Sequence, residues 1–268
     1  MLALAGGLLA GCGGAGVRSP GAAVQASAHE IKTVKWLVPP RPIAGVSQRF
    51  VGSAVRGAML LWSAGHPLPR NVVVFLHGWQ ALPPYVYGDW LRHLAAEGNT
   101  IVYPVCQGAA TRPHQVLDIA LAGIAAGLRA AHADPSAVVS IGHSTGGVIA
   151  FDYAALAGSR GLVGPRAVLA VYPGRNPPGG EIPTADLSAI PPSTRLEVIA
   201  GPGDPIPAGN AQADALLAGA TRVSSRWRSL VSAPYQRSSG PFPVSAAPRR
   251  SFWAPADRLI AQARSPVR

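Results

Sequence analysis

The stretch Ala137–Ala155, AVVSIGHSTGGVIAFDYAA, carries the clearest structural signal in the chain. An apolar, β-branched run of strand type leads into a serine flanked by glycines, and apolar residues at helical spacing follow. This order predicts that Ser144 lies on a sharp strand-to-helix turn that lifts its hydroxyl above the carboxyl end of the strand. Gly142 and Gly146 fit such a turn, because a side chain at either position would collide with neighbouring backbone. The helix that follows would point its first backbone N–H groups at a bound anion.

The chain from residue 71 onward repeats this alternation of strand and helix. Short apolar runs alternate with longer stretches whose apolar residues recur at helical spacing, which is typical of βαβ units. We therefore predict the α/β class, with a doubly wound, mainly parallel sheet. The predicted strands cover residues 71–78, 99–105, 137–141, 165–173 and 194–201, and the predicted helices cover residues 87–98, residues 114–135 and the segment after Ser144.

Three further segments add detail to this fold. Residues 32–39 (KTVKWLVP) and 56–65 (RGAMLLWSAG) are predicted to supply antiparallel edge strands before the parallel set. Residues 174–193, GRNPPGGEIPTADLSAIPPS, are rich in Gly and Pro and lack a helical apolar stripe. If this connection covers a site, it does so as a short loop, so we expect no large lid.

Three motifs resemble, in type and in order, those of the α/β-hydrolase family. They are the serine turn Gly142-His143-Ser144-Thr145-Gly146, the upstream His77-Gly78-Trp79, and Asp204 in the turn after the predicted strand 194–201. The resemblance covers about residues 70–210 and implies the α/β-hydrolase fold.

The same resemblance implies a serine hydrolase of esterase, lipase or dienelactone-hydrolase-like type. Ser144 would attack a carboxylic ester and form an acyl-enzyme. The backbone N–H groups of Trp79 and Thr145 would form the oxyanion hole, where one donor typically contributes on the order of 10²–10³ in rate. Asp204 would orient the imidazole of a catalytic histidine. The implied substrate is a small-molecule or lipid ester, and neither a cofactor nor a metal is expected.

The family's catalytic histidine has no counterpart in the expected place. The family order is serine, acid, histidine, whereas all seven histidines of this chain precede Ser144. A serine hydroxyl without a base is a weak nucleophile. Three hypotheses stay open: compensating frameshifts have altered the Arg-, Ser- and Pro-rich segment 222–250, the chain is a catalytically impaired relative that binds a ligand or partner, or another histidine has taken over. His114 is the best candidate for that third role, while His77 is expected to hydrogen-bond loop backbone.

The charge and the remaining motifs exclude several classes of function. The 268-residue chain has a formal net charge of +11, and residues 222–268 contain nine Arg against one acidic residue, Asp257. No reading helix or set of stacking aromatics accompanies these arginines, so nucleic-acid binding is not expected. No His/Cys cluster has metal-site spacing, and no phosphate-binding loop is present.

The first residues, MLALAGGLLAGCGGAG, resemble a bacterial lipoprotein signal. Small residues precede Cys12, so cleavage there and acylation of Cys12 would anchor an exported protein in the cell envelope. Without lipidation, the same segment predicts a secreted protein. No Lys or Arg precedes the apolar run, so the true start codon is expected upstream. We predict that residues 1–28 are this signal and a flexible linker, and that residues 29–268 form a single, monomeric α/β-hydrolase domain.

Overall fold

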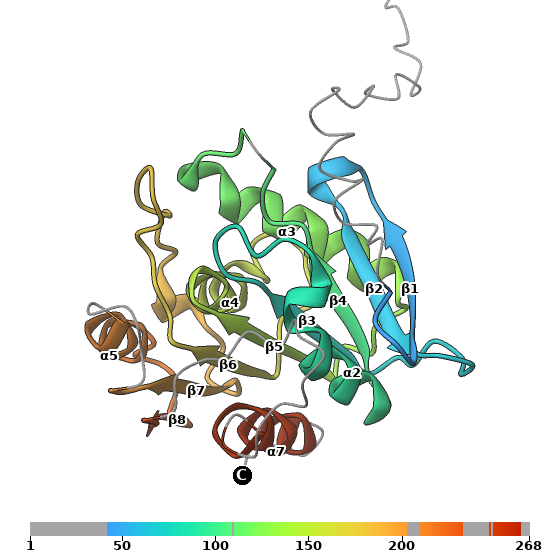
Figure 1. Ribbon diagram of the computed structural model, residues 1–268. Coiled ribbons are helices and arrows are strands. Elements are labelled where there is room, and N and C mark those ends of the chain that lie inside the picture. The colour runs from blue at the N-terminus through green and yellow to red at the C-terminus, as the bar shows by residue number, and fades with distance from the viewer. Residues whose placement is uncertain (1–41, 109, 203–208, 233–246, 248, 264–268) are drawn as a thin grey trace, which may run out of the picture.

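An eight-stranded sheet organises the residues that the structure describes (Figure 1). The structure is a computed structural model, and it describes residues 42–108, 110–202, 209–232, 247 and 249–263. The strands are β1 (Val46–Val51), β2 (Ala58–Ser63), β3 (Val72–Leu76), β4 (Thr100–Pro104), β5 (Val138–His143), β6 (Ala167–Val171), β7 (Arg195–Ala200) and β8 (Arg226–Leu230).

The strand order is β1-β2-β4-β3-β5-β6-β7-β8. Strand β2 is antiparallel to both of its neighbours, and all pairs from β4 to β8 are parallel. The prediction of a doubly wound, mainly parallel sheet is therefore confirmed. The chain leaves β3 in one direction to form β4 and then returns to the other side of β3 to form β5. Ligands bind at such switch points, outside the carboxyl ends of the strands, so the topology places a crevice between β3 and β5.

Helices cover both faces of the sheet. Helices α2 and α7 pack on one face, while α3, α4 and α5 pack on the other (Figure 1). None of the described helices is both long and apolar enough to cross a membrane. The helices are α2 (Gly88–Ala96), α3 (Pro113–Ala130), α4 (Thr145–Leu156), α5 (Gly209–Gly219) and α7 (Ala254–Ala263), with short turns at Ala54–Arg56, Pro84–Tyr87 and Leu187–Ala189 and a π-helical turn at Arg249–Trp253.

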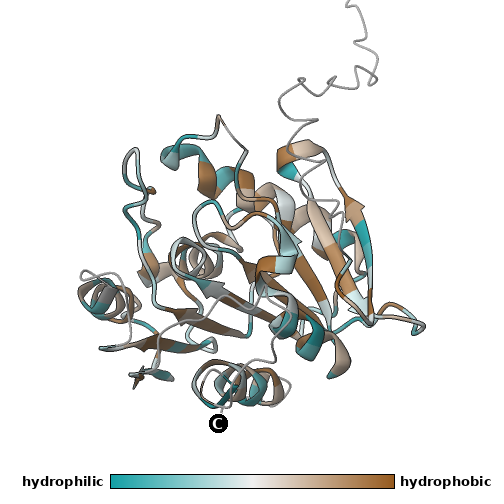
Figure 2. Cartoon of the chain, in the orientation of Figure 1, coloured by the Kyte–Doolittle hydropathy of each residue, from teal (hydrophilic) through white to brown (hydrophobic). Residues whose placement is uncertain are grey.

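The central strands are buried on both faces, which explains their composition. Every residue of β3, β4 and β6 is buried, and β3 reads VVVFL without alternation. Continuous apolar runs are typical of parallel strands between two helical layers. Figure 2 shows these strands coloured mostly as hydrophobic. Helix α2, in contrast, buries only one face, so its apolar residues keep the helical spacing from which it was predicted.

The predicted strands and helices from residue 71 to residue 201 are confirmed, and so is the edge strand within residues 56–65, which forms β2. The predicted strand 32–39 lies outside the described residues. Residues 174–193 contain one short 3-10 turn, Leu187–Ala189, and no longer element, so this connection forms no large lid, as expected.

Strand β8 lies within the Arg-, Ser- and Pro-rich segment 222–250, where no strand was predicted. It pairs in parallel with β7 at the edge of the sheet. Its arginines have local partners: Arg226 donates to the carbonyls of Ala220 and Val223, and Arg228 forms an ion pair with Asp214 of α5. The polar sequence RWRSL thus belongs to an edge strand. The rest of the segment lies largely outside the described residues.

Candidate active site

Ser144 lies at the turn between β5 and α4 in a backbone conformation that is rare for a non-glycine residue. Its φ is 53° and its ψ is −122°. The surrounding backbone fixes this conformation: the Ser144 N–H donates to the Val171 carbonyl at 2.9 Å, and the Ser144 carbonyl accepts from Gly147 at 2.8 Å and from Gly174 at 3.2 Å. Strained residues that their surroundings hold in place are concentrated at functional sites.

The two glycines that flank the serine allow this turn to pack against β3. A Cβ at Gly142 would lie 2.0 Å from the Gly146 carbonyl oxygen. A Cβ at Gly146 would lie 2.0 Å from the carbonyl oxygen of Leu76, the last residue of β3. A side chain at Gly142 would therefore force the turn itself open, and a side chain at Gly146 would force the turn away from the end of β3.

The His77-Gly78-Trp79 loop passes directly over the serine turn. A Cβ built on Gly78 would lie 3.3 Å from the Cβ of Ser144. Gly78 uses its own N–H to donate to the Tyr87 hydroxyl at 2.9 Å. Among the described residues, the backbone N–H groups of Trp79 and Thr145 have no acceptor. Both are therefore available to stabilise an oxyanion.

Buried side chains hold this loop in position. His77 directs Nδ1 at the Gly78 carbonyl (2.8 Å) and Nε2 at the Val105 carbonyl (2.9 Å), as predicted for a residue that bonds loop backbone. Burial lowers the pKa of His77. The Tyr87 hydroxyl, which accepts from Gly78, also lies 3.1 Å from Nδ1 of His143. Tyr87 thus links the loop to the nucleophile turn.

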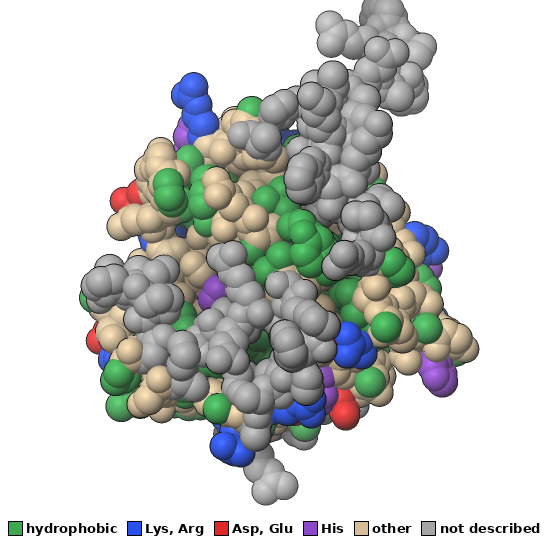
Figure 3. All heavy atoms as spheres, viewed as in Figure 1, with side chains coloured by type: hydrophobic (Ala, Val, Ile, Leu, Met, Phe, Trp, Pro, Cys, Tyr) green, Lys and Arg blue, Asp and Glu red, His purple; other side chains and the backbone are tan. Residues whose placement is uncertain are grey.

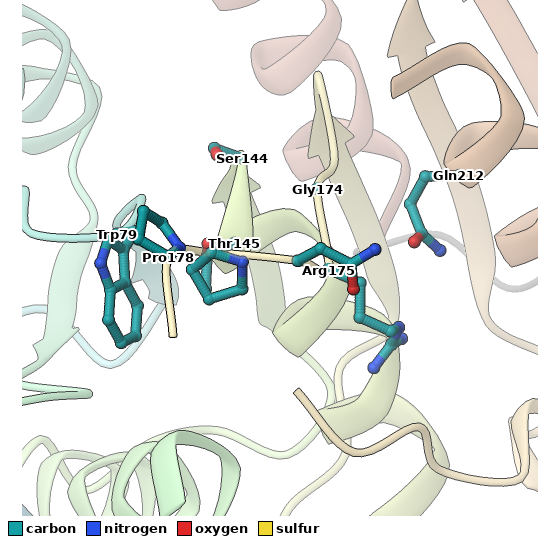
Figure 4. Close-up of a pocket in the computed structure, with 9 residues that line it drawn as sticks. Trp79, Ser144, Thr145, Gly174, Arg175, Pro178 and Gln212 are labelled. Carbon is teal, nitrogen blue, oxygen red and sulfur yellow. The ribbon is translucent and has the colours of Figure 1, made fainter. Parts of the chain in front are cut away.

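A pocket of about 180 Å³ opens beside Ser144. In Figure 4, Trp79 and Gln212 lie on opposite sides of it, with Thr145 and Gly174 between them. The loop after β6 supplies most of the remaining wall, through Arg175, Asn176, Pro177 and Pro178. The pocket therefore lies where the switch point of the sheet places a crevice.

A buried ion pair shapes this wall. Arg175 donates to Asp152 of α4 through Nη1 (3.0 Å) and Nη2 (3.3 Å). Nη1 also donates to the carbonyls of Ile182 and Pro183. Burial raises the pKa of Asp152, and the Arg175 guanidinium opposes that rise. The loop therefore wraps around one guanidinium that α4 anchors.

The structure does not place every predicted site residue. Asp204 and Cys12 lie outside the described residues. His114 is exposed in the first turn of α3 and is not part of the pocket wall. No described side chain forms a hydrogen bond with the Ser144 hydroxyl. Among the described residues there is also no cluster of three His, Cys, Asp or Glu side chains suited to a metal ion.

Sequence reasoning missed Tyr87, Arg175 and Gln212. Tyr87 contacts His143 across 56 residues of chain, and Arg175 contacts Asp152 across 23 residues. No motif joins either pair. The sequence feature that could have indicated a role for Arg175 is its position as the one charged residue in residues 174–180, immediately after a predicted strand.

Several of the arginines that give the chain its basic tail have structural partners. Arg228 pairs with Asp214, Arg258 pairs with Glu197, and Arg249 lies 5.0 Å above the Trp253 ring. On the face shown in Figure 3, the described Arg side chains are scattered. The Arg228 and Arg258 pairs join α5 and α7, respectively, to the sheet.

Comparison with solved structures agrees with this topology. The chain superposes on the hormone-sensitive-lipase homologue EstE7 from a metagenome library, with a TM-score of 0.60, 18% identity, and coverage of 88% of this chain and 91% of that one. It also superposes on a dienelactone hydrolase-like promiscuous phosphotriesterase from metagenomic libraries. The TM-score is 0.57, the identity is 17%, and the match covers 82% of this chain and 99% of that one. The fold is the α/β-hydrolase fold.

A hyperthermophilic esterase from the archaeon Pyrobaculum calidifontis has the same fold, with a TM-score of 0.55, 16% identity, and coverage of 88% of this chain and 87% of the esterase. No protein-family model matches the chain. No curated protein sequence matches it either.

Proposed function

We propose that the protein is a serine hydrolase that cleaves carboxylic esters through an acyl-enzyme on Ser144. The observation that carries this proposal is the strained serine at the end of β5, which borders a pocket beside two backbone N–H groups that have no acceptor among the described residues. The α/β-hydrolase fold of the chain, which it has in common with proteins named as esterases, supports the same chemistry.

In the proposed reaction, Ser144 Oγ attacks the ester carbonyl and gives its proton to a general base. The negative charge that develops on the carbonyl oxygen is stabilised by the N–H groups of Trp79 and Thr145. The alcohol leaves after accepting a proton, and water then releases the acid from the acyl-enzyme by the same steps. Asp204 is proposed as the acid that orients the base, by its place after β7.

The base itself is the open component of this mechanism. No described side chain bonds to the Ser144 hydroxyl. This observation favours a second candidate function, a catalytically impaired hydrolase fold that binds an ester-like ligand or a partner in the pocket. His114 remains the candidate base from the sequence. His114→Ala should abolish turnover if it acts as the base and leave turnover unchanged if it does not.

Hydrolysis of p-nitrophenyl butanoate tests the proposed function. The parent protein should release p-nitrophenol, and Ser144→Ala should lower the rate by on the order of 10³-fold or more, because the acyl-enzyme cannot form. Ser159→Ala is the matched control, since Ser159 is an exposed serine beyond the end of α4. Turnover that survives unchanged in Ser144→Ala would overturn the proposal. A folded parent without turnover would favour the binding function.

We also propose that the protein is exported and anchored to a membrane through lipidated Cys12, as its N-terminal sequence suggests. Metabolic labelling with a radioactive fatty acid should mark the parent and not Cys12→Ser. Labelling that is equal in both would contradict the anchor.

A further inference from the structure

The wall formed by residues 174–185 is attached to the nucleophile turn at one end and to α4 at the other. At the first end, the Gly174 N–H donates to the Ser144 carbonyl at 3.2 Å. At the second end, the Ala185 N–H donates to Oδ1 of Asp152 at 3.1 Å. Helix α4 begins directly after Ser144, so both attachments lead to the same rigid element.

Inside the wall, Arg175 closes the loop on itself. Its guanidinium donates to Asp152 and to the carbonyls of Ile182 and Pro183, and its own carbonyl accepts from the Ile182 N–H at 3.1 Å. Only 4% of the Arg175 side chain is exposed. Displacing the wall would unpair a buried charge, which is strongly unfavourable. The pocket wall therefore has one preferred position.

The pocket bounded by this wall is small. Its volume of about 180 Å³ is below the roughly 300–1,000 Å³ of sites for drug-sized ligands. Pro177, which is buried, and Pro178, which is exposed, line the pocket, and the proline ring fixes the backbone φ at each position. Trp79 bounds the same pocket. A chain that extends from a carbonyl on Ser144 therefore meets rigid surfaces after a short distance.

From these contacts we propose that the wall restricts the site to esters with short acyl chains, and that Pro177 and Pro178 set the limit. This inference rests on the proposed ester function and narrows its substrate class. Adding one methylene beyond what an apolar pocket holds typically lowers specificity by roughly 10-fold or more. Butanoyl esters should therefore react faster than octanoyl esters, whatever the alcohol.

The test compares p-nitrophenyl butanoate with p-nitrophenyl octanoate in the parent and in Pro177→Ala/Pro178→Ala. The parent should prefer butanoate by about 10-fold or more in kcat/KM, and the double variant should lose most of that preference because its wall recedes. Pro191→Ala is the matched control, since this exposed proline lies on the same connection outside the pocket wall. A parent that accepts both chains equally, or a double variant that keeps the preference, overturns the inference.

A binding measurement separates this inference from the proposed reaction. In Ser144→Ala, the indole N–H signal of Trp79 is followed by NMR during titration with methyl butanoate and with methyl octanoate. Only methyl butanoate should shift that signal, and both esters should shift it once Pro177 and Pro178 are replaced by Ala. Equal binding of both esters overturns the inference. Selective binding together with an inactive parent overturns the proposed reaction and supports the short-chain limit.

Discussion

Asp152 and Glu197 are both completely buried carboxylates, but they are neutralised in different surroundings. Asp152, behind the nucleophile turn, pairs with Arg175, whose side chain is 4% exposed. Glu197 of β7 pairs with Arg258 of α7, whose side chain is 47% exposed, and also accepts from the Ser229 hydroxyl at 2.6 Å. The first pair is closed to water, and the second is open to it.

This difference in solvent access distinguishes the pocket wall from the attachment of the C-terminal helix α7. When a sealed pair loses one member, the other remains as an uncompensated charge without solvent. When an open pair loses its exposed member, water takes over part of its role. The pocket wall is therefore held by contacts that no solvent can replace, whereas α7 is attached to the sheet by a contact that solvent partly replaces.

Removing the guanidinium from the sealed pair should have the largest effect. Arg175→Met should lower the free energy of unfolding by about 3–5 kcal/mol, because the Asp152 carboxylate stays buried. Urea denaturation followed by circular dichroism measures this change. Asp152→Asn combined with Arg175→Met should recover part of the loss, since the buried charge is then gone. A loss below about 1 kcal/mol for Arg175→Met would contradict the sealed character of the pair.

Removing the guanidinium from the open pair should cost less. Arg258→Met should lower the free energy of unfolding by about 1–2 kcal/mol, because Ser229 still donates to Glu197 and water can enter where the half-exposed guanidinium was. The same urea experiment compares it with Arg175→Met. Arg160→Met supplies the baseline, because both members of the Arg160–Asp118 pair are exposed and such pairs contribute about 0–1 kcal/mol. If Arg258→Met lowers the free energy of unfolding as much as Arg175→Met does, the solvent exposure of the arginine does not determine the loss of stability.

The smallest effect belongs to a third pair, His93–Asp257, which joins α2 to α7. Nε2 of His93 lies 2.9 Å from Asp257, and the ring stacks on Trp253. The hydrogen bond with Asp257 raises the pKa of His93 above its ordinary value of 6.5, against the opposing effects of burial and of Arg249. This pair therefore stabilises the fold fully below pH 6.5 and loses that contribution as the pH rises through the raised pKa.

Thermal unfolding between pH 5 and pH 9 tests that contribution. As the pH rises through the basic half of this range, the Tm of the parent should fall by more than the Tm of His93→Gln or of Asp257→Asn, because only the parent has this pair to lose. His132→Gln is the matched control, because His132 is an exposed histidine beyond the end of α3. A pH profile that is the same in the parent and in both pair variants would show that the pair adds no linked stability.

Much of the sheet was predictable because strands that are buried on both faces consist mostly of apolar residues. β3 and β6 are entirely apolar, and most residues of β5 and β7 are apolar. β1 and β8 were not predicted, since an edge strand keeps polar residues, as in RWRSL of β8. Arg228 finds its partners on α5 only after folding, so the sequence pattern alone carries no strand signal there.

The site was predictable only where it follows directly from strand ends. The serine turn and the His77-Gly78-Trp79 loop follow neighbouring parallel strands, β5 and β3, so they must lie at the same edge. Tyr87 and the Asp152–Arg175 pair depend on contacts between segments that share no motif. Asp204 follows β7 in the sequence but lies outside the described residues, so its role stays a prediction.

The central claim is that Ser144 is a reactive nucleophile, and its covalent labelling tests this most directly. The folded parent is incubated with a small alkyl fluorophosphonate and analysed by intact-protein mass spectrometry, with Ser144→Ala and Ser159→Ala alongside. Our account predicts one adduct per chain in the parent and in Ser159→Ala, located on the peptide that contains Ser144, and none in Ser144→Ala. A folded parent that takes up no probe, or equal labelling of Ser144→Ala, would contradict it.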